Sequence, residues 1–398
     1  MKKVPRLRFR GFQEDWELCK LGKLAEFNPK SNLPEKFEYV DLESVVGTEL
    51  VGHRLENRDS APSRAQRLAK KNDVFYQTVR PYQKNNYLFD LPYDNYVFST
   101  GYAQMRPSGN GYFLLTLVQE EKFVNRVLER STGTSYPAIS SNDLAKLSVR
   151  VPADIEEEQN IGKFFSNLDN LVTLHQRKLD QLKELKIAYL QVIFPVKDER
   201  VPKLRFADFE EEWELCKLGD LANIVGGGTP NTNNPKCWDG NIDWYAPAEI
   251  KEKIYVTGSK KRITELGLQK SSAKVLPIGT VLFTSRAGIG NTAILAKKGT
   301  TNQGFQSIIP NKNKLDTYFI FSRTHELKKY GEAVGAGSTF VEVSGKQMAK
   351  MPMLTPRFNE QQAIGMFFKK IDDIITLHQN KLEQLKDLKT SYLQNMFI

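Results

Sequence analysis

The heptapeptide Trp-Glu-Leu-Cys-Lys-Leu-Gly occupies residues 16–22 and occurs again, unchanged, at residues 213–219. The repeat extends beyond this word, because residues 4–27 match residues 201–224 at 16 of 24 positions with a constant offset of 197. A self-match of this length predicts two copies of one structural unit. We therefore expect two related modules, each opened by a copy of this block.

A second repeated block follows each module. Residues 157–194 match residues 360–397 at 22 of 38 positions, at an offset of 203. The intervening segments resemble each other only faintly, the clearest match being Gly133-Thr134-Ser135-Tyr136 with Gly337-Ser338-Thr339-Phe340. This order predicts two modules that share a fold and differ in surface. We divide the chain into a shared segment plus first recognition module (1–154), a central shared helix (155–200), a second shared segment plus module (201–356) and a C-terminal shared helix (357–398).

Both copies of the second block are predicted to be long helices. They are rich in Leu, Lys, Glu and Gln, and the first contains no proline before Pro195. A heptad stripe is sustained over about five repeats, which is typical of a coiled coil. Flanking positions that include Leu171 and Leu185 are expected to widen this stripe. The stripe comprises Ile161, Leu168, His175, Leu182 and Tyr189 in the first copy, and Ile364, Ile371, His378, Leu385 and Tyr392 in the second.

The two helices are expected to pair with each other. Parallel pairing would place both modules at one end, whereas antiparallel pairing suits near-identical copies related by a two-fold axis. We favour the antiparallel arrangement. His175 and His378 occupy the same position of the stripe, and we interpret them as polar residues that fix the register rather than as metal ligands.

Each module is predicted to be α+β with a β-rich centre. In the first module the pattern favours strands at residues 37–40, 74–77 and 96–99 and a helix at 116–131. In the second it favours strands at 242–245, 281–284, 292–295 and 307–309 and a helix at 315–330. The expected fold class is thus α+β, with two similar globular domains joined by two long helices that form an antiparallel, pseudo-two-fold coiled coil.

The composition favours a polyanionic partner. The chain has 398 residues and a formal net charge of +10, and residues 225–356 carry more of the excess than residues 28–153. No apolar run approaches the roughly 18 residues that span a bilayer. The first residues lack the hydrophobic segment of a signal peptide. Three cysteines without a C-x-x-C pair argue against a disulfide framework or a zinc site, so we expect a cytoplasmic protein without membrane contact.

Basic and amide side chains crowd the predicted loops of both modules. Arg and Lys suit guanine, Asn and Gln suit adenine, and any cation or small donor can hold a phosphate. The loops therefore predict a DNA-binding surface. The candidate residues are Arg64, Arg67, Lys70, Lys71, Arg80, Gln83, Lys84 and Ser135 in the first module, and Asn231, Asn233, Lys260, Lys261, Arg262, Arg286, Asn291, Gln303, Gln306, Ser338 and Thr339 in the second.

The sequence contains no recognisable catalytic or metal motif. It has no P-loop, and Gly288-Ile289-Gly290 is better explained as a tight turn. Asn28-Pro29-Lys30 lacks the second proline and the aromatic residue of an amino-methyltransferase motif. Cys19 and Cys216 are repeat-equivalent, and their leucine neighbours predict buried packing rather than nucleophilic chemistry. We therefore expect no catalytic residue in this chain.

Taken together, these features resemble the specificity subunit of type I restriction–modification systems. The resemblance covers nearly the whole chain. It depends on the block at 16–25 and 213–222, the Glu-Gln-x-Ile-Gly helix start at 158–162 with its counterpart at 361–365, and the alternation of two variable and two near-identical regions.

The resemblance implies a non-catalytic DNA-binding protein. Such subunits carry two target-recognition domains, each of which reads one half of a bipartite, asymmetric site on double-stranded DNA. Their helices pair antiparallel, set the gap between the half-sites and dock two modification (methyltransferase) subunits. Two restriction (translocase and nuclease) subunits complete the complex. S-adenosylmethionine, ATP and Mg²⁺ are then expected in the partner subunits, with no cofactor in this chain.

Two other classes of function remain open from the sequence. One is a single-chain DNA methyltransferase or nuclease with an unrecognised motif. The other is a coiled-coil scaffold protein in which the basic loops have no role in binding DNA.

Overall fold

The computed structural model describes residues 4–196, 199–250, 253–286, 288–335 and 342–398. The chain divides into two compact units, one containing residues 1–177 and 379–398 and the other residues 178–378. Two long helices, α4 (Ile155–Ile193) and α10 (Phe358–Met396), are each divided between the units. Each unit therefore consists of one globular module and a segment of both helices.

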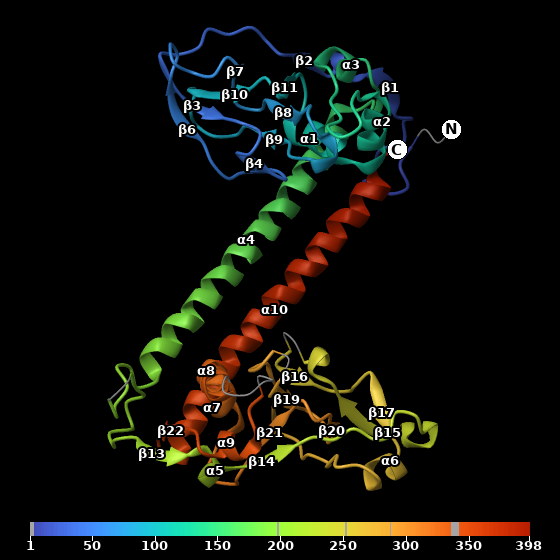
Figure 1. Ribbon diagram of the computed structural model, residues 1–398. Coiled ribbons are helices and arrows are strands. Elements are labelled where there is room, and N and C mark those ends of the chain that lie inside the picture. The colour runs from blue at the N-terminus through green and yellow to red at the C-terminus, as the bar shows by residue number, and fades with distance from the viewer. Residues whose placement is uncertain (1–3, 197–198, 251–252, 287, 336–341) are drawn as a thin grey trace. The chain divides into compact units, whose positions relative to one another are not determined.

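The first module is built from two four-stranded sheets (Figure 1). Their strand orders are β6-β3-β10-β7 and β2-β11-β8-β9. In the first sheet β3 and β10 are parallel, whereas β3 with β6 and β10 with β7 are antiparallel. The three predicted strands are confirmed as β3, β8 and β10. The strands are β2 (Ala25–Phe27), β3 (Lys36–Val40), β6 (Arg54–Asn57), β7 (Ala65–Leu68), β8 (Val74–Gln77), β9 (Tyr87–Leu88), β10 (Tyr96–Ser99) and β11 (Tyr102–Pro107), with a small hairpin of β4 (Val45–Val46) and β5 (Glu49–Leu50).

Aromatic side chains join these two sheets. Phe75 of β8 and Phe98 of β10 are both fully buried, and their rings stack with centroids 3.7 Å apart. Tyr102 packs edge-on against both rings. Large buried rings contribute strongly to a core because each removes a large apolar area from water. The two sheets of the first module are therefore held together by a common core.

The second module contains a five-stranded sheet, β14-β21-β18-β19-β16, and a three-stranded sheet, β17-β15-β20. Both sheets of this module include a parallel pair, β15 with β20 in the three-stranded sheet and β16 with β19 in the five-stranded sheet. The predicted strands are confirmed within β15, β18, β19 and β21. The strands are β14 (Ala222–Gly226), β15 (Trp238–Tyr245), β16 (Tyr255–Val256), β17 (Lys261–Ile263), β18 (Val281–Phe283), β19 (Thr292–Leu295), β20 (Thr300–Thr301) and β21 (Gln306–Pro310).

The repeated heptapeptide forms a short strand in each unit. β1 (Glu17–Lys20) pairs with β12 (Ser148–Val151), and β13 (Glu214–Lys217) pairs in the same way with β22 (Pro352–Thr355). Leu18 and Leu215 are each 63% exposed, because alternate residues of a strand face opposite sides. The expectation that Cys19 and Cys216 lie in a fully apolar, buried setting is therefore wrong, and both are half-buried. Short helices accompany these strands, namely α3 (Ser141–Ala145), α5 (Leu218–Leu221) and α9 (Gly345–Ala349), whereas α6 (Glu265–Gln269) packs beside β15 and β17.

The single helices predicted at 116–131 and 315–330 are each wrong, because a helix pair occupies each region. α1 (Gly111–Gln119) begins after Asn110, whose side chain caps Phe113 N, and α2 (Glu121–Arg130) begins after Glu120, which caps Phe123 N. An acceptor side chain on extended backbone starts a new helix. In the second module α7 (Thr317–Ser322) and α8 (Thr324–Gly335) are separated by Arg323.

The two long helices agree with the prediction to within two residues at each end. Asp154 caps the backbone N–H of Glu156, and three glutamates in the first turn favour the positive end of the helix dipole. All ten residues of the heptad stripe are buried or half-buried. Leu171 and Leu185 are 45% and 44% exposed, so the prediction that they widen the stripe is wrong. A pairing seam between two helices needs only the narrower stripe.

Within each unit the two helix segments run antiparallel. In the first unit Phe164 packs on Tyr392, with ring centroids 4.9 Å apart, and further along α4 Asp169 pairs with Lys389 at 2.6 Å. In the second unit Lys186 pairs with Asp372 at 2.6 Å, and further along α4 Tyr189 packs on Phe367. In both units, therefore, the residue numbers of the contacts rise along α4 as they fall along α10.

A buried carboxylate attaches the first repeated block to the start of each long helix. Glu157 is fully buried and accepts hydrogen bonds from Arg8 Nε (2.6 Å), Arg8 Nη2 (2.8 Å) and Trp16 Nε1 (3.2 Å). In the second unit Glu360 accepts from Arg205 and Trp213 in the same way. These hydrogen bonds raise the pKa of both guanidinium groups.

A second repeated contact attaches each module to both helices. Tyr112 of α1 donates to Asp169 of α4 (2.6 Å), and Asp169 also pairs with Lys389 of α10. The second unit repeats this contact, with Tyr318 of α7 donating to Asp372 (2.8 Å), which pairs with Lys186. Burial, and then the neighbouring aspartate, raises the pKa of both tyrosines. The unit is thus a repeated arrangement of module and helices, and the repeated blocks supply every anchor residue except Tyr112 and Tyr318, which lie within the modules.

Among the described residues, no helix is both long enough and apolar enough to cross a membrane.

The Glu157 anchor yields a stability prediction. We expect Glu157→Gln to lower the free energy of unfolding by about 3 kcal/mol, because Arg8 then stays largely buried without its carboxylate. Glu360→Gln should have a similar effect through Arg205. Urea denaturation followed by tryptophan fluorescence measures both. The exposed neighbour Glu156 provides the matched control, Glu156→Gln, and a loss no larger than the control's would contradict this role.

Candidate DNA interface

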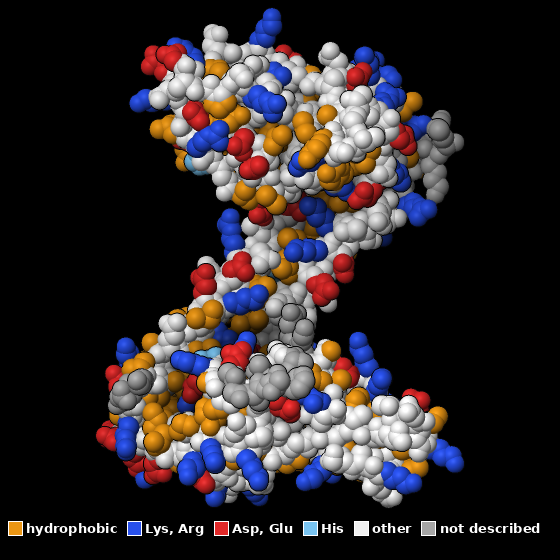
Figure 2. Space-filling model, in the orientation of Figure 1, with side chains coloured by type: hydrophobic (Ala, Val, Ile, Leu, Met, Phe, Trp, Pro, Cys, Tyr) orange, Lys and Arg blue, Asp and Glu red, His pale blue; other side chains and the backbone are white. Residues whose placement is uncertain are grey.

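Positive charge is unevenly divided between the two modules. Residues 225–356 contain twice as many Lys and Arg as Asp and Glu, whereas residues 28–153 are nearly balanced. Figure 2 shows Lys and Arg side chains dispersed among acidic and neutral ones on the faces that it draws, without one continuous basic patch. A polyanion such as DNA is attracted by this excess, and contacts at particular side chains must supply the specificity.

In the first module the candidate residues form two groups. One group surrounds β7 and comprises Arg64, Arg67, Lys70 and Lys71, of which only Arg67 is half-buried. The other comprises Arg80, Gln83, Lys84 and Ser135. Arg80 lies with its guanidinium 4.4 Å from the centroid of the Tyr136 ring, and its backbone N–H donates to Pro137. The predicted candidates Arg80 and Ser135 therefore lie in adjoining segments.

Two candidates of this second group have structural partners. Lys84 forms an ion pair with Glu121 of α2. Gln83 accepts a hydrogen bond from Gln77 Nε2 (2.9 Å). A side chain that is already paired within the module is a weaker candidate for contacting DNA than an exposed one.

In the second module one group of candidates surrounds β17. Lys261 lies 5.6 Å from the centroid of the Trp238 ring, and Arg262 pairs with Asp243 at 3.3 Å while remaining 55% exposed. Trp238 donates to the backbone oxygen of Asn231, so this loop joins the group. Asn233 and Lys260 are exposed at the same part of the module, and the Lys260 backbone N–H is held by Glu249.

A second group lies where β18 and β20 end. Arg286 lies over Gly304, and a Cβ atom added to Gly304 would lie 3.6 Å from the Arg286 Nε atom. The side chain of Gln303 accepts a hydrogen bond from the Thr229 hydroxyl. Asn291 N donates to Thr284 Oγ1 within the turn that Gly288 and Gly290 form with positive φ. Gln306 lies half-buried in β21 beside Gly226 and Gly345, away from the loop tips. Ser338 and Thr339 lie outside the described residues.

Arg80 and Arg286 lie close to corresponding places in the two modules, since the shared bridge aligns Arg286 with Val79, the residue before Arg80. Val79 forms an isolated antiparallel bridge with Ala138, and Arg286 forms one with Glu342. Ala138 and Glu342 are also equivalent in the alignment of the Gly-Thr-Ser-Tyr and Gly-Ser-Thr-Phe segments. Each module thus places an arginine beside the same recurring segment.

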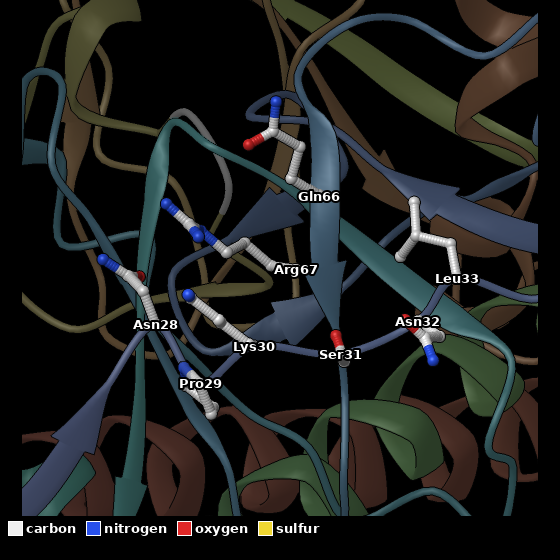
Figure 3. Close-up of a pocket in the computed structure, with 8 residues that line it drawn as sticks. All are labelled: Asn28, Pro29, Lys30, Ser31, Asn32, Leu33, Gln66 and Arg67. Carbon is white, nitrogen blue, oxygen red and sulfur yellow. The ribbon is translucent and has the colours of Figure 1, made fainter.

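Sequence reasoning missed two kinds of residue. Tyr136 and Trp238 support cations through their ring faces, and only a search for aromatic residues near the basic loops would have suggested them. Asn28 and Lys30 line a cavity of about 550 Å³ together with Gln66 and Arg67 (Figure 3). The sequence suggests a role for the Asn28-Pro29-Lys30 stretch only as a catalytic motif. The cavity forms because β7 lies opposite this stretch, which the sequence does not reveal.

The described residues contain no group of three or more His, Cys, Asp and Glu side chains that could hold a metal ion. Burial raises the pKa of the Cys19 thiol, which makes it a weaker nucleophile at neutral pH.

Comparison with known proteins identifies one family. A model of the type I restriction modification DNA specificity domain matches residues 13–184 and 210–387. The HindI specificity subunit of Haemophilus influenzae is 22% identical over 96% of this chain and 99% of that protein. The MjaIX specificity subunit of Methanocaldococcus jannaschii is 33% identical, but the match covers 47% of this chain and only 44% of that protein.

Solved structures show the same fold. The S subunit of a type I restriction-modification system from M. genitalium aligns over 99% of both chains with a TM-score of 0.67 and 14% identity. A chain from a study of assembly and conformational transition of the type I R-M system covers 98% of this chain and 99% of its own length, with a TM-score of 0.52 and 22% identity.

The paired arginines yield a binding prediction. We expect Arg286→Ala and Arg80→Ala each to weaken binding to a preferred duplex by about 1–3 kcal/mol if the side chain contacts a base. Fluorescence anisotropy with preferred and random duplexes measures the difference. Lys312→Ala removes one exposed cation from the second module as a control. An equal loss on every sequence would show that the arginine holds phosphate instead.

Proposed function

The chain belongs to the type I restriction modification DNA specificity family, and from this premise we propose that it is the DNA-reading subunit of such a system. Each module reads one half of a bipartite site on double-stranded DNA. The observation that carries this proposal is the contrast between the two kinds of region. The anchors that build each unit are repeated residue for residue, whereas the donor-rich loops differ in both charge and sequence.

The proposed site is asymmetric because the loops of the two modules differ. The first module offers Arg67 beside β7 and Arg80 on Tyr136, and the second offers Lys261 on Trp238 and the Asn231 loop. Different donor sets select different bases. Two unlike readers on equivalent frames therefore select two unlike half-sites. The four-part division of the chain at residues 154, 200 and 356 is part of this proposal.

The long helices set the spacing of the half-sites in this proposal. α4 and α10 form an antiparallel, pseudo-two-fold coiled coil over their whole length. The antiparallel contacts within each unit and the burial of the heptad stripe support it. A stiff paired helix fixes the distance between two readers, so that spacing becomes part of the recognised sequence, as it does for dimeric repressors.

The outer faces of the helices dock two methyltransferase subunits in this proposal. Three exposed apolar positions recur at the offset of 203, namely Leu171 with Ile374, Leu174 with Leu377, and Leu185 with Leu388, and all six side chains are 43–66% exposed. Each unit contains one member of each pair, because Leu171, Leu174 and Leu388 lie in the first unit and Ile374, Leu377 and Leu185 in the second. Apolar side chains kept exposed at equivalent places suit two copies of one partner.

The chemistry is assigned to the partners. The methyltransferase subunits bind S-adenosylmethionine, and two restriction subunits use ATP and Mg²⁺. This chain holds none of these cofactors and acts on DNA in the cytoplasm without membrane contact. Incubating the purified chain alone with DNA, S-adenosylmethionine, ATP and Mg²⁺ tests the non-catalytic role, since methylation or cleavage would favour a single-chain enzyme. Absence of any sequence preference in the assembled complex would favour a scaffold.

Helix length offers a test of the spacing role. We expect removal of one heptad from each helix, residues 171–177 together with residues 374–380, to shift the preferred gap while leaving both half-site sequences unchanged, because the modules themselves are intact. Selection of binding sites from a pool of random duplexes measures both properties. Altered half-sites at an unchanged gap would refute the spacing role.

The duplicated apolar positions offer a test of partner number. We expect Leu174→Glu to reduce the number of bound methyltransferase subunits from two to one, and Leu174→Glu with Leu377→Glu to abolish their binding, because a charge must then be buried in each interface. Native mass spectrometry of the assembled complex counts the subunits. Val51→Glu, at a residue of the first module that is 59% exposed, serves as the matched control. Full occupancy in the double variant would exclude this surface.

A further inference from the structure

A cationic cleft lies beside the edge of one sheet in the first module. One wall is the segment of residues 28–33 that follows β2, and the other is β7, the last strand of the sheet β6-β3-β10-β7. The eight lining residues include Arg67 and Lys30 and no Asp or Glu. The cavity of about 550 Å³ is within the size range of pockets that hold small ligands.

The backbone of Arg67 is fixed within β7, and no carboxylate among the described residues pairs with its side chain. It pairs with Phe98 across the sheet, and the neighbouring Leu68 carbonyl accepts a hydrogen bond from the buried Gln104 at 2.8 Å. Its Nε atom is buried and has no hydrogen-bond partner among the described residues. Burial lowers the pKa of this guanidinium. A half-buried cation without an acceptor is unfavourable unless a ligand supplies one.

The direction of the side chains agrees with this reading of the cleft. Figure 3 shows the terminal nitrogen atoms of Asn28, Lys30 and Arg67 on the same side of β7. Asn28 has positive φ, and its Oδ1 accepts from Gln104 N at 3.0 Å, which fixes the start of the opposite wall. Lys30 is exposed, whereas Arg67 is half-buried. The cleft thus has a half-buried guanidinium in its interior and an exposed ammonium group at its rim.

The corresponding place in the second module is closed. Residues 28–33, which follow β2, correspond at the offset of 197 to residues 225–230, of which 225 and 226 end β14 and 227–230 follow it. There Gly228 lies so close to Ser272 and Ala273 that a Cβ at this position would collide with them. The Gly228 carbonyl also accepts from Trp244 Nε1 at 2.8 Å. The open cleft is therefore a feature of the first module that its repeat lacks.

We propose that this cleft is the base-reading site of the first module, in which Arg67 contacts a guanine edge and Lys30 holds an adjacent phosphate. This inference rests on the proposed function. A rigid fork of donors matches the two acceptors of guanine in the major groove. A flexible ammonium group at the rim suits the uniform charge of the backbone.

Selection from random duplexes tests the inference with the full chain assembled with its methyltransferase subunits. Wild-type complex should recover two half-sites. Arg67→Gln should relax one or two positions in one half-site, with discrimination there falling by about 5- to 150-fold, and leave the other half-site unchanged. Arg67→Lys should relax the same positions, because an ammonium group lacks the bidentate fork. Lys30→Gln should weaken all sequences alike and reduce the salt dependence by about one phosphate contact.

Arg58→Gln is the matched control, since it removes a cation that is 53% exposed elsewhere in the same module, and it should change no base preference. Thermal unfolding of Arg67→Gln should be unchanged or shifted upward, because the variant loses an unpaired cation. Unchanged half-sites in both Arg67 variants, or a loss that is equal for all sequences, would overturn the inference. A wild-type complex without any sequence preference would instead refute the proposed function.

Discussion

The structure depends on two buried carboxylates, those of Glu157 and Glu360. Each lies in the first turn of a long helix and is satisfied by an arginine and a tryptophan from the repeated block that precedes the module. Residues about 150 positions apart are thereby fixed together. A buried carboxylate is unfavourable without such partners. A substitution that removes a partner in one block therefore destabilises its contact with the other block. This constraint explains why the two kinds of repeat occur as a matched set.

The Tyr112–Asp169–Lys389 contact and its repeat complete the set of anchors that holds each module on its two helix segments. We call this set of anchors the frame. One aspartate binds a tyrosine of the module and a lysine of the opposite helix, so it fixes the module and the helix pair with a single side chain. Because these anchors hold the module on the helices, the loops contribute little to the stability of the fold. The loops can therefore differ between the modules, as the open cleft of the first module and the close packing at Gly228 in the second show.

The sequence predicted the frame better than the surface. Periodicity located the long helices and most strands, because burial imposes a pattern on consecutive residues. It failed to locate the break between the two helices of each pair, at Glu120 and at Arg323. Polar residues mark these breaks, and the spacing of apolar residues does not reveal them. It also did not reveal that Lys84, a candidate for contacting DNA, pairs with Glu121, because a composition does not show ion pairs between segments distant in the sequence.

The same physics separates two meanings of repetition in this chain. Repeated residues that are buried, such as Trp16 and Trp213, are explained by the fold alone. Repeated residues that are exposed and apolar, such as Leu174 and Leu377, are not, because each adds nothing to the core and leaves apolar surface in water. Exposed apolar side chains that recur without stabilising the fold point to a contact that is made twice. In the proposed function, the repeats therefore carry the frame and the partner contacts, and the choice of DNA bases is left to the residues that do not repeat.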